Sequence, residues 1–457
     1  MPSAGILLTD CLCRRWRHVW KCEENLSHFQ KNAKWQGHFV QRSSRFAAVH
    51  GLFVGITAGG GRGGRVKSML GGGQGGIVMK VVDMHCDTIS VLLHRKEQGK
   101  QGALRQNEGH IDLLRMQKGQ YLLQNFALFV MLEKDGDPWE RVCQLYRCYQ
   151  EELERNQDIL APVFHFSDIA KNEAAGKMSA MLTVEEGGVC KGQVEKLREL
   201  YRMGVRMITL TWNFENEIGF PNFLPDLKRQ MRQAMDAWRN VTKEAGNRSE
   251  QEMENQKEQK AVLRREQEEK RRRAQEAFDA FYHTPNITGG LSEKGREMVA
   301  EMERLGIIPD VSHLSDKGFY DVLELTKKPF VASHSNARAI CPCVRNMTDD
   351  MIRRLSERGG VMGLNFCADF LEEKPIGVKN PGTIDAIVRH ARHIASVGGI
   401  EVLGLGSDFD GIDTHEELPG AQSMEKLWEA LHKAGFSEGE LDKIFYRNVL
   451  RVYKDTI

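Results

Sequence analysis

Two residues with metal-binding side chains, His85 and Asp87, follow a short apolar run that begins at Val81. In an extended strand, residues i and i+2 point to the same face, so the imidazole and the carboxylate would project together from the strand end. A neutral imidazole and a carboxylate suit a divalent metal ion of the zinc class. An isolated His-x-Asp pair is more often a surface feature near a turn. The metal hypothesis therefore depends on what the rest of the chain places beside this pair.

Four more β-type runs end in polar residues of the same kind. They are Thr183-Val184-Glu185-Glu186-Gly187-Gly188, Asp310-Val311-Ser312-His313, Ser333-His334-Ser335 and Gly406-Ser407-Asp408-Phe409-Asp410-Gly411. Each motif alone has an ordinary structural explanation, such as a helix-entry loop or a core histidine. If the five ends converge, three histidines and several carboxylates can hold two metal ions, with one carboxylate bridging them. A water molecule shared by the two ions would become hydroxide near neutral pH.

The elements that would position these residues alternate between β-type runs and amphipathic helices. Eight β-type runs can be recognised: Val81–Met84, Phe126–Leu132, Met178–Val184, Met207–Thr211, Ile307–Val311, Pro329–Ala332, Val361–Asn365 and Val402–Leu405. Helical patterns lie between most of them, for example at Val194–Met203, Gly295–Leu305, Asp349–Arg358 and Ile384–Val397. This alternation predicts an α/β fold with a parallel sheet, and eight repeats predict a (β/α)8 TIM barrel. In such a barrel the carboxyl ends of the strands meet on one face, where active sites form.

One charged interval, residues 224–286, interrupts the alternation. Apolar residues recur there at helical spacing only near its two ends: Met231, Met235 and Trp238, then Ala274, Phe278 and Phe281. Gly246-Asn247 offers a helix stop and Ser249-x-x-Glu252 is a capping-box pattern. The interval predicts a mostly solvated helical hairpin inserted into the barrel, with its apolar ends nearest the barrel. Binding of a partner protein is the less favoured interpretation.

Residues 1–78 do not have the pattern of a folded domain. They are rich in Lys and Arg, and they contain the glycine runs 59–61, 63–64, 71–73 and 75–76. Such a segment buries too little apolar surface to offset its ordering entropy. A transit peptide fits the glycine runs poorly. Because Met79 directly precedes the first β-type run, we expect residues 1–78 to be a disordered or non-native extension, with residues 79–457 forming the barrel.

Composition limits the classes of partner and compartment. The chain has 457 residues, 64 basic and 63 acidic side chains and a net charge of +1, which gives no footprint for nucleic acid or an anionic membrane. No apolar run approaches the roughly 20 residues of a membrane span. The 10 cysteines are scattered without a paired CxxC pattern, which favours reduced thiols and a cytoplasmic protein. A homodimer is compatible with these features.

From Met79 onward, the sequence resembles the membrane dipeptidase (renal dipeptidase) family and looks like a soluble, bacterial-type member. The matching motifs are Asp83-x-His85-x-Asp87, Glu186-Gly187-Gly188, Asp310-Val311-Ser312-His313, Ser333-His334-Ser335, Arg345-Asn346 and Gly406-x-Asp408-Phe409-Asp410-Gly411. The family's members are peptidases with a (β/α)8 barrel and two zinc ions. The resemblance implies a zinc-dependent dipeptidase that tolerates a D-residue at the C-terminal position.

The same resemblance assigns roles to individual residues. His85 and Asp87 would bind one zinc ion and His313 and His334 the other, while Glu186 would bridge both. The Gly-Gly pair after Glu186 decides which of the two adjacent glutamates aligns with the family. Arg345 would hold the carboxylate of a dipeptide substrate with its planar fork. Asp408 would pass a proton from the attacking water to the leaving amine.

One position departs from the family. Its mammalian members have a histidine after Thr-Leu-Thr that contacts the reaction intermediate, whereas here Thr209-Leu210-Thr211 is followed by Trp212. Trp212 is therefore a candidate substrate-binding residue with an altered role.

Two rival functions remain at this point: another binuclear barrel that hydrolyses N-acyl amino acids or cyclic amides, and a non-catalytic metal-binding barrel. The dipeptidase interpretation is favoured because all five expected ligands, Arg345 and Asp408 are present.

Overall fold

The computed structural model describes residues 79–246, 257–413 and 415–457. The expectations for residues 1–78, for Asn247 and for the Ser249–Glu252 capping pattern lie outside these ranges. Within them, no helix is long and apolar enough to cross a membrane.

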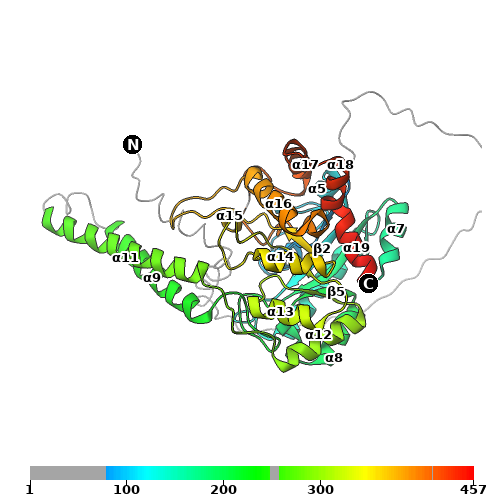
Figure 1. Cartoon of the computed structure of the whole chain (residues 1–457), viewed down its shortest axis with the longest axis horizontal. Coiled ribbons are helices and arrows are strands. Elements are labelled where there is room, and N and C mark those ends of the chain that lie inside the picture. The colour runs from blue at the N-terminus through cyan, green and yellow to red at the C-terminus, as the bar shows by residue number, and fades with distance from the viewer. Residues whose placement is uncertain (1–78, 247–256, 414) are drawn as a thin grey trace, which may run out of the picture. The chain divides into compact units, whose positions relative to one another are not determined.

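Eight parallel strands close into a barrel. Figure 1 shows helices packed around it. In the order in which they pair around it, they are β1 (Val81–Asp83), β2 (Tyr121–Phe129), β4 (Met178–Glu185), β5 (Val205–Thr209), β6 (Ile308–Asp310), β7 (Val331–Ala332), β8 (Val361–Leu364) and β9 (Leu403–Leu405). The pairing of β2 with β4 and of β9 with β1 completes the circle. A ninth strand, β3 (Leu160–Pro162), pairs only with the start of β4 and was not expected from the sequence. The predicted (β/α)8 fold is confirmed.

Helices follow most strands and surround the sheet. Their bounds are α4 (Thr88–Glu97), α5 (Leu113–Lys118), α6 (Pro138–Arg155), α7 (Phe166–Ala174), α8 (Val194–Met203), α12 (Glu293–Leu305), α13 (Asp316–Leu325), α14 (Asp349–Glu357), α15 (Ala368–Leu371), α16 (Ile384–Gly398), α17 (Met424–Lys433), α18 (Glu438–Asp442) and α19 (Asn448–Thr456), with short helical turns at Gly187–Cys190, Ile400–Val402, Ala421–Ser423 and Lys443–Arg447. The four helices named in the sequence analysis begin and end within two residues of their predicted bounds. Three of them start where the pattern indicates because Ser292, Thr348 and Thr383 accept a backbone N–H with their side chains.

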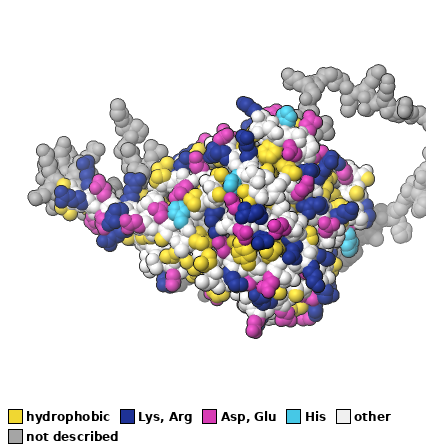
Figure 2. All heavy atoms as spheres, viewed as in Figure 1, with side chains coloured by type: hydrophobic (Ala, Val, Ile, Leu, Met, Phe, Trp, Pro, Cys, Tyr) yellow, Lys and Arg dark blue, Asp and Glu magenta, His cyan; other side chains and the backbone are white. Residues whose placement is uncertain are grey.

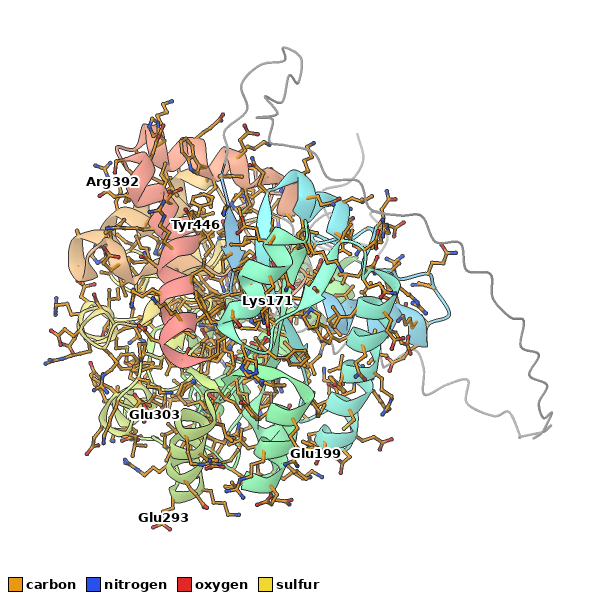
Figure 3. The ribbon with its side chains drawn as sticks, turned by 90° about the vertical axis from the view of Figure 1, so that its right-hand side faces the viewer. Lys171, Glu199, Glu293, Glu303, Arg392 and Tyr446 are labelled. Carbon is orange, nitrogen blue, oxygen red and sulfur yellow. The ribbon has the colours of Figure 1, made fainter. Side chains whose placement is uncertain are left out.

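The last helix closes one end of the barrel core. Val449, Val452 and Tyr453 of α19 belong to one buried cluster with Val82 and Met84. The hydroxyl of Tyr453 donates to Asn125 Oδ1 at 3.0 Å, so this ring is buried with its polar atom satisfied. Figure 3 shows the outer layer of helices, with Lys171, Glu199 and Glu303 labelled on it.

The charged interval forms two helices that lie side by side (Figure 1), α9 (Pro225–Gly246) and α11 (Lys257–His283). Their buried residues include the predicted ones, Met231, Met235, Trp238, Ala274, Phe278 and Phe281, together with Lys228, Val241 and Tyr282. In α11, before these apolar residues, Glu269 pairs with Arg272 and Arg273, as expected for a solvated face. Figure 2 shows acidic and basic side chains interspersed over this hairpin and over the visible face of the barrel.

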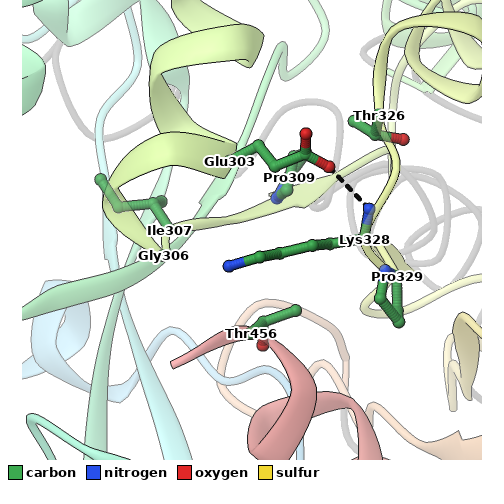
Figure 4. A pocket seen from close by; sticks show the side chains of 8 residues that line it. All are labelled: Glu303, Gly306, Ile307, Pro309, Thr326, Lys328, Pro329 and Thr456. Atoms are coloured by element: carbon green, nitrogen blue, oxygen red, sulfur yellow. Dashed lines mark hydrogen bonds between the residues drawn. The ribbon is translucent and has the colours of Figure 1, made fainter.

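A small pocket lies at the amino ends of β6 and β7 (Figure 4). Lys328, Thr326 and Thr456 are among the residues that line it, and Glu303 Oε1 accepts the backbone N–H of Lys328 at 2.6 Å. Active sites of this fold form at the carboxyl ends of the strands. The pocket is therefore a feature of the opposite, structural end.

Candidate active site and metal centre

The carboxyl ends of five strands bring the polar motifs together, as predicted. His85 follows β1, Glu185 ends β4, His313 follows β6, His334 follows β7 and Asp408 follows β9. Each of these side chains is buried, with no residue more than 9% exposed. Burial of so many ionisable groups requires that they be paired or coordinate an ion.

Glu185 is the centre of the cluster. Its Oε1 lies 3.3 Å from His313 Nε2 and 3.6 Å from His334 Nε2. Its Oε2 lies 3.3 Å from His85 Nε2. One carboxylate thus presents one oxygen to two histidines and the other oxygen to the third histidine. This is the arrangement in which a carboxylate can bridge two metal ions.

Neighbouring residues decide which nitrogen of two of the histidines carries the proton. His313 Nδ1 lies 3.0 Å from Asn213 Oδ1, an acceptor, so Nδ1 is the protonated nitrogen and Nε2 has a free lone pair. Ser333 Oγ lies 2.6 Å from Asp310 Oδ2 and 2.7 Å from His334 Nδ1. Because the hydroxyl donates to Asp310, His334 Nδ1–H donates to Ser333, and Nε2 is again free.

The two free nitrogens face each other. His313 Nε2 and His334 Nε2 are 3.0 Å apart, and both are acceptors in the tautomers just assigned. Two facing lone pairs repel unless a cation lies beside them. Ligand atoms of a tetrahedral zinc ion are about 3.3 Å apart, given bond lengths of about 2.0–2.1 Å. The triangle formed by these nitrogens and Glu185 Oε1 has edges of 3.0, 3.3 and 3.6 Å, so it fits one face of such a site.

A second group of polar side chains surrounds His85. Its Nε2 is 3.9 Å from Asp87 Oδ2 and 4.0 Å from Asp408 Oδ1. Asp87 Oδ1 is a buried atom without a hydrogen-bond partner among the described residues. At the end of β1, Asp83 accepts the N–H and O–H of Ser407 at 2.9 and 2.6 Å, which ties β1 to the residues that follow β9. The donor set of imidazole and carboxylate fits a divalent metal ion of the zinc class.

Electrostatics in the protein alone reflect this crowding of charge. Burial opposes protonation of His85, but Glu185, Asp87 and Asp408 outweigh it and raise the pKa of His85 to about 10. Burial, together with the charge of Arg345, lowers the pKa of His313 to about 4. Burial raises the pKa of Asp408. Glu185 is also buried, yet His85 and His313 hold its pKa below the ordinary value, so it is a carboxylate.

Glu186, which was predicted to be the bridging carboxylate, does not face the histidines; Glu185 does. Backbone pairing continues through Glu185, which is opposite Thr209 of β5, whereas Glu186 has left the strand with φ of 93°. Its side chain turns away from the histidines and accepts N–H groups from Gly188, Trp212 and Asn216. Burial raises its pKa to about 7. Glu186 therefore fastens two loops together. Glu185 lies between the histidines, where the sequence analysis expected Glu186.

The other predicted residues lie at the rim of the cluster. Arg345 is 2% exposed and donates from Nη1 to Ser335 Oγ at 3.0 Å, while its Nε and Nη2 lack hydrogen-bond partners among the described residues. Asp408 Oδ2 accepts from Asn365 Nδ2 at 3.0 Å. The Trp212 ring lies 6.1 Å from that of His313 and packs edge-on against Phe129 at 4.9 Å.

Backbone strain is concentrated at this face. His313, Asp408, Asp410 and Glu186 all have positive φ, at 66°, 62°, 69° and 93°. Such conformations cost free energy in non-glycine residues and persist where the surrounding structure fixes them, commonly at active sites. Asp410 is fixed by Thr88, whose hydroxyl donates to it at 2.7 Å, and by the backbone N–H of His110.

The sequence profile described as "Membrane dipeptidase (Peptidase family M19)" matches residues 77–233 and 270–456. The chain belongs to this family of metal-dependent peptide-bond hydrolases. The resemblance inferred from the motifs is thereby confirmed. The profile leaves out residues 234–269, which lie within the predicted insertion.

Individual relatives agree with the family. An uncharacterized protein of Klebsiella pneumoniae is 37% identical over 177 residues, which are 38% of this chain and 65% of that protein. An uncharacterized dipeptidase of Schizosaccharomyces pombe is 27% identical over 405 residues, covering 82% of this chain and 80% of the relative. A metallopeptidase of Rhodobacter sphaeroides, solved with a phosphinate mimic of the dipeptide L-Ala-D-Ala, has a TM-score of 0.65 at 22% identity, covering 83% of this chain and 99% of that one. The last likeness supports the fold.

Several residues of the site were given no role by the sequence analysis, although Asp83, Asp310 and Ser333 belong to its motifs. Asn213 and Ser333 orient histidines, Asp310 and Asp83 support the strand ends, and Asn365 holds Asp408. The direction in which side chains point along the paired strands distinguishes Glu185 from Glu186. Paired residues of parallel neighbours face the same side, and Glu185 pairs with Thr209, which pairs with Asp310. The Thr209 hydroxyl donates to Asp310 Oδ2 at 2.6 Å, so this side is the barrel interior.

Proposed function

We propose that this chain is a dipeptidase with two zinc ions per chain. The observation that carries the proposal is the position of Glu185, with one oxygen toward His313 and His334 and the other toward His85. In this proposal His313 and His334 hold one ion, His85 and Asp87 hold the other, and Glu185 contacts both. When bound there, zinc supplies Lewis acidity for the peptide carbonyl and lowers the pKa of water.

Arg345 is proposed to bind the C-terminal carboxylate of the dipeptide. Its guanidinium is buried, and its Nε and Nη2 have no hydrogen-bond partners among the described residues. A buried donor pair of this kind suits a carboxylate, which can accept two parallel hydrogen bonds from a guanidinium fork. This requirement for a free carboxylate favours dipeptides over cyclic amides, and it limits the length of peptide that fits.

Asp408 is proposed to move the proton. Asn365 Nδ2 donates to its Oδ2, which leaves Oδ1 on the side of His85. Burial raises the pKa of Asp408, which helps a carboxylate to accept a proton from water and to return it to the leaving amine. The amide of Asn365 fixes the orientation of this carboxylate throughout.

Trp212 is proposed to contact the substrate from the side of His313. Its backbone N–H donates to Glu186 Oε2 at 3.0 Å, and its ring is almost fully buried between Phe129 and Phe214. The indole of Trp212 offers an apolar surface where the family's mammalian members have a histidine.

We also propose tolerance of a C-terminal D-residue, in keeping with the L-Ala-D-Ala mimic bound by the Rhodobacter sphaeroides enzyme.

Two broader expectations complete the proposal. A cytoplasmic location is consistent with seven described cysteines that are all free thiols. The homodimer stays a prediction, which light scattering of the purified chain would test.

A screen of L,L- and L,D-dipeptides tests the function. Hydrolysis should require added zinc, stop with a chelator and recover when zinc is restored. Dipeptide amides and N-acyl amino acids serve as the rival substrates. Hydrolysis of amides as fast as free dipeptides would contradict the role of Arg345, and no hydrolysis of any dipeptide by the zinc-loaded chain would contradict the proposed function.

A further inference from the structure

The inner end of the inserted hairpin contacts the part of the barrel that carries Arg345. Tyr282, in the last turn of α11, is 5% exposed and packs on Phe278, with ring centroids 5.0 Å apart. Its carbonyl oxygen accepts the backbone N–H of Val344 at 2.9 Å, one residue before Arg345. Its hydroxyl donates to the backbone oxygen of Asp369, one residue before Phe370. Tyr282 therefore joins two barrel segments, which we call the arginine loop (residues 341–346) and the phenylalanine turn (residues 368–371).

These two segments form one side of the carboxylate subsite. The guanidinium carbon of Arg345 lies 5.6 Å from the centroid of the Phe370 ring, within range of a cation–π contact. Asn346 Nδ2 donates to the backbone oxygens of Cys341 and Phe370, at 2.9 and 2.8 Å, and so links the two segments directly, as does Cys341 Sγ, which lies 3.7 Å from the backbone oxygen of Asp369. Among the described residues, the side chain of Arg345 makes one hydrogen bond, from Nη1 to Ser335. The location of its guanidinium thus depends on the loop that carries it.

We infer that Tyr282 is a positioning residue for substrate binding, through which the insertion sets the location of Arg345 and Phe370. This inference rests on the proposed function. Tyr282 itself touches neither the histidine cluster nor any of the proposed metal ligands. It acts by satisfying the carbonyl of Asp369 and the N–H of Val344, both of which belong to segments packed beside the subsite. Binding groups that are displaced by as little as 1 Å can lose much of their effect.

Two further contacts connect the hairpin to the same region. Gln275 Oε1 accepts the backbone N–H of Ile376 at 2.9 Å, and His283 Nε2 lies 3.3 Å from a carboxylate oxygen of Glu373. Gln275, Tyr282 and His283 all belong to α11. The inner end of α11 therefore contacts three residues of the segment that follows β8, Asp369, Glu373 and Ile376, and Tyr282 also bonds to Val344 beside Arg345.

The variant Tyr282→Phe tests the inference with a minimal change. It removes the O–H group but keeps the ring against Phe278 and the backbone bond to Val344. The KM for free dipeptides should rise about threefold to tenfold, the worth of one hydrogen bond, while kcat changes less than twofold. Zinc content should be unchanged, and kcat/KM for a dipeptide amide, which lacks the carboxylate, should stay at its wild-type value.

Tyr320→Phe is the matched control. The Tyr320 hydroxyl donates to Asp350 Oδ2 at 2.8 Å between two outer helices, α13 and α14. Its loss should leave KM, kcat and zinc content unchanged. A double variant completes the test, because Tyr282→Phe should add little to the KM of Arg345→Lys if it acts through the arginine.

Each other outcome has a definite meaning. An active wild type with an unchanged KM in Tyr282→Phe overturns the inference and leaves the proposed function intact. Equal losses for dipeptides and their amides, a fall in zinc content, or independent effects in the double variant show general destabilisation and also overturn it. A zinc-loaded wild type that hydrolyses no dipeptide overturns the proposed function and, with it, the inference.

Discussion

Replacing Glu185 by glutamine should remove metal from the site. The two oxygens of Glu185 serve different neighbours, His313 and His334 on one side and His85 on the other. Glutamine keeps the volume, but it has a single neutral carbonyl oxygen and an amide nitrogen without a lone pair to give. Whichever way the amide is turned, one proposed ion loses a ligand atom and both lose the negative charge that offsets their repulsion.

The expected loss of zinc affinity is large because Glu185 lies directly beside the three histidines. Removal of a group that only orients a metal ligand typically lowers metal affinity by about 10- to 100-fold. Glu185 is itself within 3.3–3.6 Å of all three histidine nitrogens, so its replacement should cost at least about 100-fold in affinity. After dialysis, Glu185→Gln should hold fewer than two zinc ions per chain and show little hydrolysis.

Glu186→Gln is the matched control on the adjacent residue. Glu186 accepts N–H groups from Gly188, Trp212 and Asn216, and it touches none of the three histidines. Glutamine can satisfy only the donors on its carbonyl side, which leaves one buried N–H group facing the amide nitrogen. We expect the free energy of unfolding to fall by about 1–3 kcal/mol, the usual cost of an unpaired buried donor, with zinc content close to that of the wild type.

Metal analysis of the two variants, together with zinc titration calorimetry and thermal unfolding of the apoproteins, decides between the glutamates. The reasoning is refuted if Glu186→Gln loses the metal while Glu185→Gln keeps two zinc ions. It is also refuted if both variants keep two zinc ions. Loss of metal from both, with both apoproteins folded, would mean that the loop fastened by Glu186 shapes the site as strongly as the ligand does.

Four more predictions concern the rim, the proton, the core and the extension. Arg345→Lys keeps the charge but loses the fork, and it should lower kcat/KM for dipeptides by about 1.5–3 kcal/mol, measured against dipeptide amides as the control substrate. Asp408→Asn should keep two zinc ions and the bond from Asn365, yet lose about 10²- to 10⁴-fold in kcat; a metal-free variant would instead identify Asp408 as a ligand. His390 accepts the N–H of Ala337 and contacts the oxygen of Leu371, and burial lowers its pKa from 6.5 to about 4. Between these values only the unfolded chain binds the proton, so stability should fall as pH decreases from 6.5 to 4, by about 2 kcal/mol at pH 5, and denaturant unfolding of His390→Gln should show a smaller change. A chain that begins at Met79 should keep full activity and melting temperature, and a loss of several degrees would show that residues 1–78 stabilise the barrel.

The sequence was sufficient for the architecture because two periodicities separate the elements clearly. Buried parallel strands have continuous apolar runs, and the surface helices have one apolar face, so most of the predicted elements were located within two residues. The exception is β2 (Tyr121–Phe129), which begins five residues before the predicted run Phe126–Leu132. The strand β3 was missed because three residues, Leu160–Pro162, carry no periodicity and include a proline. It pairs only with the beginning of β4, an edge position in which proline's missing N–H is tolerated.

One residue of the predicted ligand set lies elsewhere than expected, and the difference has a physical origin. Glu185 and Glu186 are chemically identical and adjacent, so composition and motif spacing cannot separate them. What separates them is the point at which β4 stops: Glu185 keeps the strand geometry opposite Thr209, and the positive φ of Glu186 turns its side chain out of the interior. The register that pairs Glu185 with Thr209, and Thr209 with Asp310, places all three on the interior side, and this register comes from the structure.

The roles of the residues that orient the proposed ligands could not be predicted from the sequence, for a different reason. Asn213 and His313, or Asn365 and Asp408, are far apart in the chain and meet only after the barrel closes. Amide and hydroxyl side chains carry no periodic signal, so their roles follow from geometry alone. The same holds for Tyr282, which the helical pattern could place on α11 but not beside Asp369. The sequence pattern of the charged insertion predicts a solvated surface, and most of the insertion is one. The part to which we assign a function is its short inner end, which contacts the segments beside Arg345.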